Sequence, residues 1–354
     1  MIDINNYGFM PNMMTECAEG VPARVTAVHK ERYELACEYG ECFGRLKSSI
    51  YYGHSTEEFP TVGDFVLIDY NLNGDSLIIK TLERKTFFSR LDPTPGRGEQ
   101  AVAANFDYVF IMQSLNHDFN IKRLDRYLTL AWQSGAVPVV LLTKSDLLDD
   151  CMEQLSIAHA ATAGVGVFAI SAHTEFGLDE LAEYLNPGKT IVFLGSSGVG
   201  KSSLVNALAK QSGHTEDIMA VKEIREDDSR GRHTTTHRQL IMLPNGVMII
   251  DTPGMRELGM WNVSGGLGEA FSDVEQYFSL CKFSDCKHQA EPGCAVKKAI
   301  ECGELPAQRW ESYMKLKKEA KFTEDKAGFL RERQEWHKSI SKWSRQNKKN
   351  GGKQ

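Results

Sequence analysis

The segment Gly195–Ser202, which reads G-S-S-G-V-G-K-S, constrains this 354-residue chain more than any other feature. It follows the apolar run Thr190–Leu194 and opens a helical pattern at Lys201. A Gly-rich turn between a buried strand and a helix presents backbone N–H groups at the positive end of the helix, an arrangement that binds phosphate. The spacing in this context predicts a nucleotide-binding α/β domain, and an accidental Gly-rich loop is the alternative.

Each residue type in this loop has an expected role. The glycines let backbone N–H groups wrap the phosphates, Lys201 reaches the β- and γ-phosphates, and the Ser202 hydroxyl binds Mg²⁺. The predicted phosphate-binding residues are Gly195, Ser196, Ser197, Gly198, Val199, Gly200, Lys201, Ser202 and Ser203.

A second segment, D-T-P-G at Asp251–Gly254, ends another apolar run. Asp251 is expected to support the Mg²⁺ shell, and the backbone N–H of Gly254 to meet the γ-phosphate. Alone, D-T-P-G is equally an ordinary turn. Downstream of a phosphate loop it predicts a nucleotide sensor.

Two further loops indicate that the base is guanine. T-K-S-D closes the apolar run Val137–Leu142, and its Asp carboxylate can accept two hydrogen bonds from guanine N1–H and the exocyclic amine, a donor pair that adenine lacks. The Lys would lie along the base plane, and a backbone N–H of the S-A pair after the next strand could bind guanine O6. The predicted base-reading residues are Thr143, Lys144, Ser145, Asp146, Ser171 and Ala172.

These segments resemble the five nucleotide-binding motifs of translation-factor-like GTPases in a different order. The base-reading loops precede the phosphate loop, the Thr-rich segment His233–Thr236 and the D-T-P-G. The sequence is therefore circularly permuted, and the segment that senses the γ-phosphate leads directly into the C-terminal region. From this order we hypothesise that hydrolysis moves that region.

The N-terminal part has a different pattern. From about residue 20 to 87, alternating apolar residues and an Asn73-Gly74 turn predict a small antiparallel barrel, with an OB-type barrel favoured over other small barrels. Proline and glycine between 89 and 104 predict a loop or linker. Beyond it, continuous apolar strands alternate with helices, which indicates a parallel sheet covered on both faces.

The C-terminal part contains a dense cysteine cluster, Cys281-x₄-Cys286-x-His288-x₅-Cys294. Three thiolates and one imidazole complete a tetrahedral shell, so we predict one structural Zn²⁺ per chain. Cys302 is a second-choice ligand. The remaining cysteines show no ligand spacing and are interpreted as ordinary small apolar residues: Cys17, Cys37, Cys42 and Cys151.

Charge and hydropathy indicate where the protein is located and what it binds. No apolar run approaches the roughly 20 residues that cross a bilayer, so we expect no membrane span and no membrane partner. Because Met1–Thr15 lacks the pattern of a secretory signal, we expect the protein to be cytoplasmic. The chain carries a net charge of −6, yet Trp336–Gln354 holds six basic residues and no acidic one. This tail suits phosphate backbones or an acidic partner, and a solvated terminus explains it equally.

The sequence thus predicts a multidomain protein with a circularly permuted α/β P-loop GTPase domain at its centre. The predicted division is an OB-fold barrel (1–88), a linker (89–105), the GTPase domain (106–264), an α-helical zinc-binding domain (265–335) and a basic tail (336–354).

This combination resembles the ribosome small subunit-dependent GTPase A family over nearly the whole chain. Three motifs carry the resemblance: G-x-H-T-T-T at Gly231–Thr236, T-K-x-D before the phosphate loop, and the cysteine cluster. The resemblance implies an enzyme that hydrolyses GTP to GDP and phosphate. It also implies that the enzyme acts late in small-subunit assembly, binds the subunit and its rRNA, and is stimulated by it.

Catalysis is assigned by the same resemblance. Met255 stands where many regulatory GTPases carry a Gln that orients water, and a thioether cannot do so. The resemblance implies His233 instead, with Thr235 sensing Mg²⁺, although an exposed loop histidine is the alternative. The predicted Mg²⁺ ligands are Ser202, Thr235 and Asp251.

Two other functions compete with this interpretation. In one, the chain is an RNA-binding assembly module whose guanine nucleotide is regulatory and is not turned over. In the other, it is a P-loop ATPase or kinase, which would leave Asp146 without a purpose. Nothing in the sequence demands more than a monomer.

Overall fold

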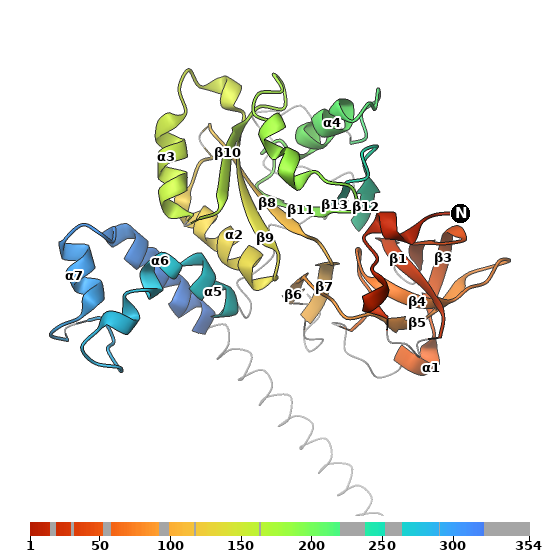
Figure 1. Ribbon diagram of the computed structural model, residues 1–354, viewed down its shortest axis with the longest axis horizontal. Coiled ribbons are helices and arrows are strands. Elements are labelled where there is room, and N and C mark those ends of the chain that lie inside the picture. Colours follow the sequence, from red (N-terminus) through yellow and green to blue (C-terminus); the bar gives the residue numbers. More distant parts are fainter. Residues whose placement is uncertain are drawn as a thin grey trace, which may run out of the picture.

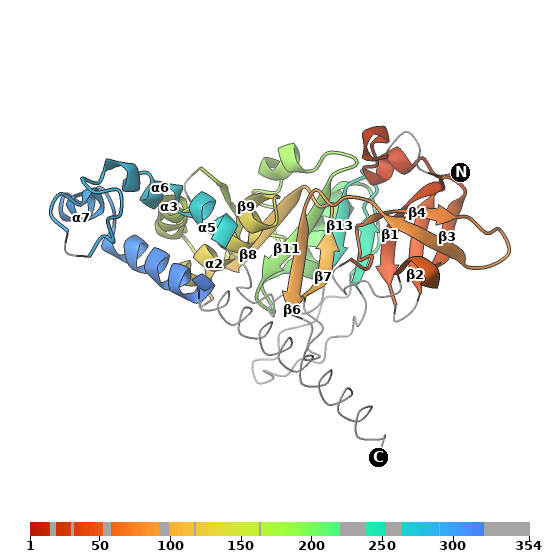
Figure 2. The same ribbon diagram turned by 90° about the horizontal axis from the view of Figure 1, so that it is seen from below.

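The structure, a computed structural model, places three units in a row along the long axis: a β-barrel, a sheet covered by helices, and a small helical unit (Figure 1). The barrel and the helical unit lie at opposite ends (Figure 2). Within the described ranges, no helix is both long and apolar enough to cross a membrane. The structure describes residues 1–14, 19–29, 32–51, 58–91, 99–116, 118–162, 164–219, 238–251, 264–289 and 291–321.

The N-terminal barrel closes on itself. Its strands follow the order β1-β2-β3-β5-β4, with β4 pairing back onto β1 and with β3 parallel to β5. Apolar side chains that alternate along the strands, such as Val25, Leu35, Val66 and Ile78, are fully buried inside. The prediction of an OB-type barrel is confirmed. The strands are β1 (Val21–Val28), β2 (Tyr33–Cys37), β3 (Gly40–Leu46), β4 (Phe65–Asp69) and β5 (Ser76–Thr81), with α1 (Ser48–Tyr51) after β3.

The central unit is a parallel sheet in the order β10-β9-β8-β11-β13. Its strands are nearly continuously apolar and buried, as predicted for a sheet covered on both faces. The strands are β8 (Tyr108–Ser114), β9 (Val137–Thr143), β10 (Gly166–Ile170), β11 (Thr190–Gly195) and β13 (Met248–Asp251).

Helices cover both faces of this sheet. The α2 and α3 face is packed by Leu124, Leu128 and Ala158, whereas the α4 face is packed by Leu204 and Leu208. Asn120 caps α2 by accepting the Arg123 N–H at 3.1 Å. The helices are α2 (Ile121–Gln133), α3 (Met152–Ala161) and α4 (Lys201–Gln211), and a short 3₁₀ turn, η3 (Ser145–Leu147), follows β9.

The barrel and the parallel sheet share hydrogen bonds. Strand β12 (Arg238–Met242) runs antiparallel to β13 and also pairs with β1, so that Val28 lies opposite Arg238. The two units therefore form one continuous eleven-stranded sheet. Arg24 reinforces the junction, because its buried guanidinium donates to Asn105 O at 2.9 Å. Burial lowers the pKa of Arg24 to about 10, so it remains charged at neutral pH.

One local prediction was wrong. Residues 89–105, expected to be a loop or linker, contribute to a hairpin of β6 (Phe87–Leu91) and β7 (Glu99–Ala104). Phe88 of this hairpin stacks on Phe106, with ring centroids 4.8 Å apart. Between β10 and β11 the chain forms the 3₁₀ helix η4 (Asp179–Tyr184). Leu178, which precedes η4, and Leu181 within it are both buried and lie three residues apart, which matches the three-residue turn of a 3₁₀ helix.

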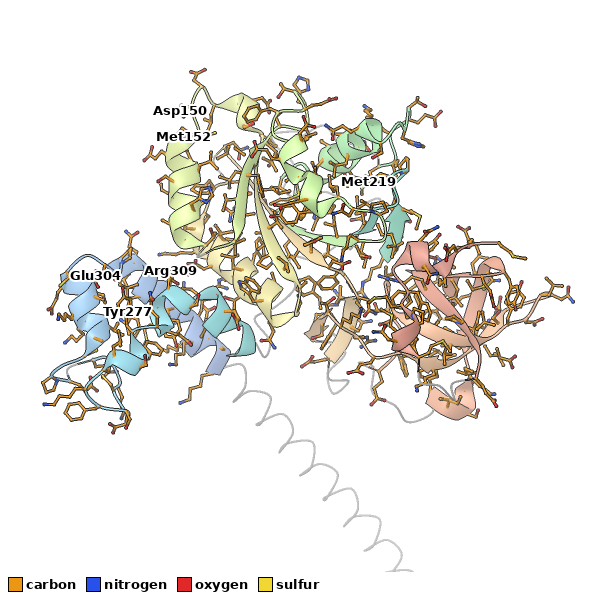
Figure 3. All side chains as sticks on the ribbon, in the orientation of Figure 1. Asp150, Met152, Met219, Tyr277, Glu304 and Arg309 are labelled. Atoms are coloured by element: carbon orange, nitrogen blue, oxygen red, sulfur yellow. The ribbon has the colours of Figure 1, made fainter. Side chains whose placement is uncertain are left out.

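The C-terminal unit is helical, as predicted, and packs on α2 (Figure 2). A Cβ on Gly266 would lie 2.2 Å from Thr129 O, so glycine permits the close approach of α5 to α2. Arg309 lies in this C-terminal unit (Figure 3). It donates to Asp125 of α2 at 2.7 Å and to Asp273 at 3.0 Å. The helices are α5 (Ser264–Ala270), α6 (Ser272–Glu275), η6 (Phe278–Leu280), α7 (Ala295–Glu301) and a helix over 307–321.

Candidate nucleotide site and metal centre

The predicted nucleotide-binding loops gather at one edge of the parallel sheet. Thr143 ends β9, Ser171 follows β10, Gly195 ends β11 and Asp251 ends β13. Carboxyl ends of parallel strands meet at one edge. The strands β8, β9 and β10 are added toward one side of the sheet and β11 and β13 toward the other, so the strand order reverses between β8 and β11, where ligands of such sheets bind. The permuted order of the motifs therefore still brings them to one place.

The phosphate loop has the backbone geometry that its glycines predict. Gly198 and Gly200 have φ angles of 72° and 104°, the left-handed region that glycine adopts without strain. A Cβ on Gly195 would lie 2.9 Å from Met112 O, so this position admits only glycine. Lys201 opens α4, and the first N–H groups of any helix have no carbonyl partner within the helix itself, so this end of α4 suits an anion.

The two base-reading loops are joined by a side-chain hydrogen bond. The Ser171 hydroxyl donates to Asp146 Oδ1 at 2.5 Å. The same hydroxyl oxygen accepts the N–H groups of His173 and Thr174, each at 3.2 Å. Ser171 is completely buried while Asp146 is exposed, so a buried anchor orients an accessible carboxylate.

The base-reading and phosphate loops are also tied to each other. The buried Thr143 hydroxyl donates to Val199 O in the phosphate loop at 2.6 Å. Lys144, the next residue, has a φ of 61°, which turns the chain sharply after β9. The two kinds of loop are therefore parts of one site.

Replacing Thr143 by Val should weaken guanine nucleotide binding, because the buried Val199 carbonyl loses its donor. A buried acceptor left without a partner costs about 1–3 kcal/mol, which corresponds to roughly a five- to hundredfold loss of affinity. Calorimetric titration with GDP measures this change. Thr162→Val, which removes a hydroxyl donating to His159 O at the end of α3, is the matched control. Equal GDP affinity in both variants would contradict the predicted tie.

One contact in this site was not predicted. The Ser196 hydroxyl of the phosphate loop donates to Asp118 Oδ2, in the loop after β8. No motif marks Asp118, but its place directly after a strand at the topological switch point is a signal that could have found it.

Some of the predicted site residues lie outside the described ranges. These are His233, Thr235 and Gly254, together with Met255 and the basic tail 336–354. Asp251 is half-buried at the end of β13, and Ser202 and Ser203 lie in the first turn of α4.

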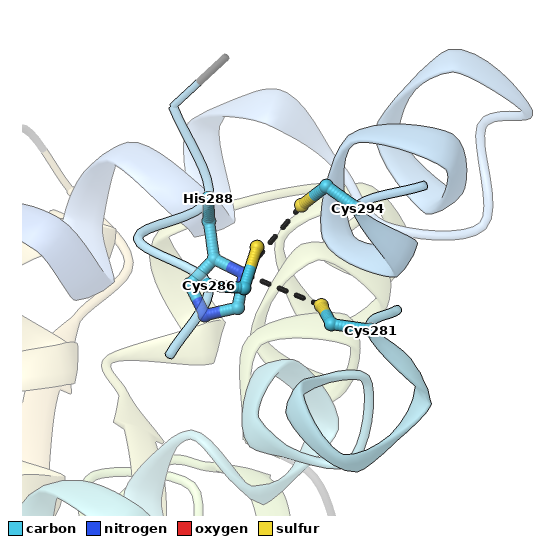
Figure 4. Close-up of side chains that lie close together, drawn as sticks. All are labelled: Cys281, Cys286, His288 and Cys294. Atoms are coloured by element: carbon cyan, nitrogen blue, oxygen red, sulfur yellow. Dashed lines mark hydrogen bonds between the residues drawn. The ribbon is translucent and has the colours of Figure 1, made fainter. Parts of the chain in front are cut away.

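The four predicted metal ligands converge in the C-terminal unit (Figure 4). The thiol sulfurs of Cys281, Cys286 and Cys294 and a ring nitrogen of His288 all lie within 4.8 Å of one another. His288 Nδ1 is 3.5 Å from the sulfurs of both Cys281 and Cys294. The cluster could therefore hold a metal ion, and Cys302, which is exposed, is not part of it.

The surroundings of the cluster favour metal binding. His288 stacks on Phe278 with ring centroids 4.5 Å apart and meets the edge of Trp310 at 5.6 Å. Burial, aided by the charge of Lys317, lowers the pKa of His288, so its imidazole is neutral and able to bind a metal at neutral pH. The Ala295 N–H donates to Cys281 Sγ at 3.4 Å, which stabilises a thiolate.

Comparisons with known proteins agree with this arrangement. The model of the family described as RsgA GTPase matches residues 81–261. A relative from Listeria monocytogenes named small ribosomal subunit biogenesis GTPase RsgA 1 is 47% identical over 296 residues, which cover 84% of this chain and 82% of the relative.

Two solved structures are also similar. YjeQ from Thermotoga maritima has a TM-score of 0.64 and 26% identity, and the match covers 85% of this chain and 98% of that one. YloQ, described as a circularly permuted GTPase, has a TM-score of 0.59 and 25% identity, and the match covers 87% and 98% of the two chains.

Proposed function

This chain belongs to the RsgA GTPase family, and on that premise we propose that it hydrolyses GTP to GDP and phosphate while docked on the small ribosomal subunit that it helps to assemble. The observation that carries the proposal is the pair of hydrogen bonds from Ser171 to Asp146 and from Thr143 to the phosphate loop. They join guanine recognition to phosphate binding in one site. The names of the relatives favour GTP turnover over a purely regulatory nucleotide.

The residues take these roles in the proposal. Asp146 accepts from guanine N1–H and the exocyclic amine, while a backbone N–H near Ala172 meets guanine O6. The N–H groups of Gly195–Gly200 wrap the phosphates, and Lys201 neutralises the β- and γ-phosphate oxygens. We propose that His233, which lies outside the described ranges, positions the attacking water.

Two metal ions belong to the proposal. A Mg²⁺ ion would be held by Ser202, Asp251 and Thr235, and would neutralise charge on the phosphates. For the cysteine cluster we propose Zn²⁺. Bond lengths of about 2.3 Å to sulfur and 2.0 Å to nitrogen put neighbouring ligands of a tetrahedral zinc roughly 3.5–3.8 Å apart, close to the 3.5 Å between His288 Nδ1 and the sulfurs of Cys281 and Cys294.

We propose that the partner is the rRNA of the small subunit and that the barrel forms part of the surface that binds it. The exposed Tyr39 lies against the partly buried Tyr70 with ring centroids 4.5 Å apart, and Arg32 covers the exposed Phe43 ring at 3.7 Å. Exposed aromatic and arginine faces on an OB barrel suit unpaired bases and phosphates. We also propose a cytoplasmic monomer divided into the predicted units, with the tail 336–354 adding salt-dependent affinity.

The experiment is GTP hydrolysis by the full chain with purified small subunits added and withheld. Stimulation by subunits is expected, and turnover of GTP should exceed that of ATP. Equal turnover with and without subunits would leave a nucleotide-binding protein whose catalysis does not depend on this partner.

Replacing His233 by Ala should lower subunit-stimulated turnover by about 10²–10³-fold, the usual cost of losing a water-positioning or proton-accepting group. GDP affinity should stay within about twofold, because His233 has no role in holding the nucleotide in this proposal. The measurement pairs stimulated kcat with a GDP titration, and His214→Ala, an exposed histidine after α4, is the control. Unchanged stimulated turnover would remove His233 from the mechanism.

A further inference from the structure

The carboxylate of Asp118 bridges the phosphate loop and α2. Its Oδ2 accepts from the Ser196 hydroxyl, and its Oδ1 lies 2.9 Å from the guanidinium of Arg123 in the first turn of α2. Arg123 also donates to the Asp118 carbonyl oxygen. Both carboxylate oxygens are therefore occupied, one by the nucleotide site and one by the helix.

The loop that carries Asp118 is held independently of Ser196. Asn116 Oδ1 accepts from the Asp118 N–H at 3.1 Å and from the Ser114 hydroxyl at 2.8 Å. The buried side chain of Gln113 accepts from the Asn120 N–H at 2.8 Å and donates to Asn120 O at 3.1 Å. Because this backbone is fixed at both ends, Asp118 restrains Ser196 rather than following it.

The same helix also seats the C-terminal unit. One turn along α2, the buried Asp125 pairs with Arg309 at 2.7 Å, and Arg126 pairs with Glu319 at 2.7 Å. Further along, Gly266 of α5 donates its N–H to Gln133 Oε1 at 2.7 Å and packs against the α2 backbone. Thus the first turn of α2 is linked to the phosphate loop through Arg123 and Asp118, and the rest of the helix contacts the C-terminal unit.

We propose that Asp118 is a positioning residue of the phosphate loop and that, through Arg123, it makes α2 the element that couples bound nucleotide to the seating of the C-terminal unit. This inference rests on the proposed guanine nucleotide site. Phosphates bound at the loop would repel the Asp118 carboxylate toward the Arg123 guanidinium, which would strengthen the pairing of these two residues. A change at the C-terminal face of α2 acts on the nucleotide through the same pair. This route is separate from the segment that follows Asp251.

The test measures dissociation of fluorescently labelled GDP from the full chain. Asp118→Ala and Ser196→Ala should each speed dissociation on the order of tenfold, as expected for losing a hydrogen bond to a charged group. The double variant should be no faster than the faster single one, because both remove one contact. Lys189→Met, which removes an exposed ion pair with Asp107 at the opposite edge of the sheet, should leave dissociation unchanged.

The coupling itself is tested from the far side of α2. Gly266→Ala should change GDP dissociation several-fold in the native background and have no effect in the Asp118→Ala background. A thermal melt first establishes that each variant is folded, and Glu319→Gln, which removes the exposed pair with Arg126, replaces Gly266→Ala if that variant does not fold.

If Gly266→Ala changed the GDP dissociation rate by the same factor in the native chain and in the chain altered at Asp118, or changed it in neither, the coupling would be overturned. Failure of the native chain to bind GDP would instead overturn the proposed function, so the two failures are distinguishable.

Discussion

Replacing Asp146 by Asn is expected to weaken binding of GTP and GDP by a hundredfold or more and to remove the preference for guanine. The carboxylate accepts two hydrogen bonds from guanine in the proposal, whereas an amide turns an N–H toward the donors of the base. Each hydrogen bond to a charged group contributes about 1.5–3 kcal/mol. Losing one such bond and placing two N–H donors against each other should therefore lower the affinity for guanine nucleotides roughly 10²–10³-fold. The acceptor for the Ser171 hydroxyl survives in Asn, so the loop should keep its shape.

Xanthosine diphosphate sharpens this test, because its oxygen at C2 accepts the N–H that the new amide of the Asp146→Asn variant would offer. Affinities of the native and variant chains for GDP, ADP and xanthosine diphosphate are measured by calorimetry. Asp149→Asn, at an exposed carboxylate three residues further along, is the control and should behave as the native chain. A variant at Asp146 that still prefers GDP would show that this carboxylate does not read the base.

Loss of the metal should have the largest effect on stability. Structural zinc contributes about 10–16 kcal/mol to small metal-dependent folds. The buried residues Phe271, Val274 and Val296 of the C-terminal unit belong to a core that the unit shares with α2 and does not form alone. Cys294→Ser, or a strong chelator, is therefore expected to unfold this unit and to expose it to protease. The central sheet should still bind GDP, because the core on its α4 side, which includes Leu204 and Leu208, contains no residue of the C-terminal unit.

Metal content by mass spectrometry and amide hydrogen exchange of 264–321 measure the effect. Cys302→Ser is the matched control, since Cys302 is exposed and outside the cluster. One metal per chain in both variants, with unchanged exchange, would contradict a structural metal held by Cys294.

The parts of the fold that follow from local patterns were predictable. Alternation marked β1, the Asn73-Gly74 turn marked β4 and β5, continuous apolar runs marked β8, β9 and β11, and ligand spacing marked the cysteine cluster. The parallel sheet that these apolar runs indicated places the base-reading and phosphate loops at one edge, and the bond from Thr143 to Val199 agrees with that. In each case the signal lies within a few residues of the feature.

Features that depend on distant pairing were not predictable. Pro93, Pro95 and Gly96 dominate the sequence around the β6–β7 hairpin and hide its short strands. The pairing of Val28 with Arg238 joins residues far apart in the chain, as does the ion pair of Asp125 with Arg309. Periodicity reports which face of an element is buried, but it does not say what that face or edge will meet.

The pairing of β1 with β12 has a mechanical consequence. A barrel attached by a peptide linker could swivel, but here a ladder of backbone hydrogen bonds resists rotation about the junction. A large partner that binds the barrel is therefore also held at a fixed angle to the sheet edge that bears Gly195 and Asp146. The orientation of the molecule on such a partner is set when the chain folds.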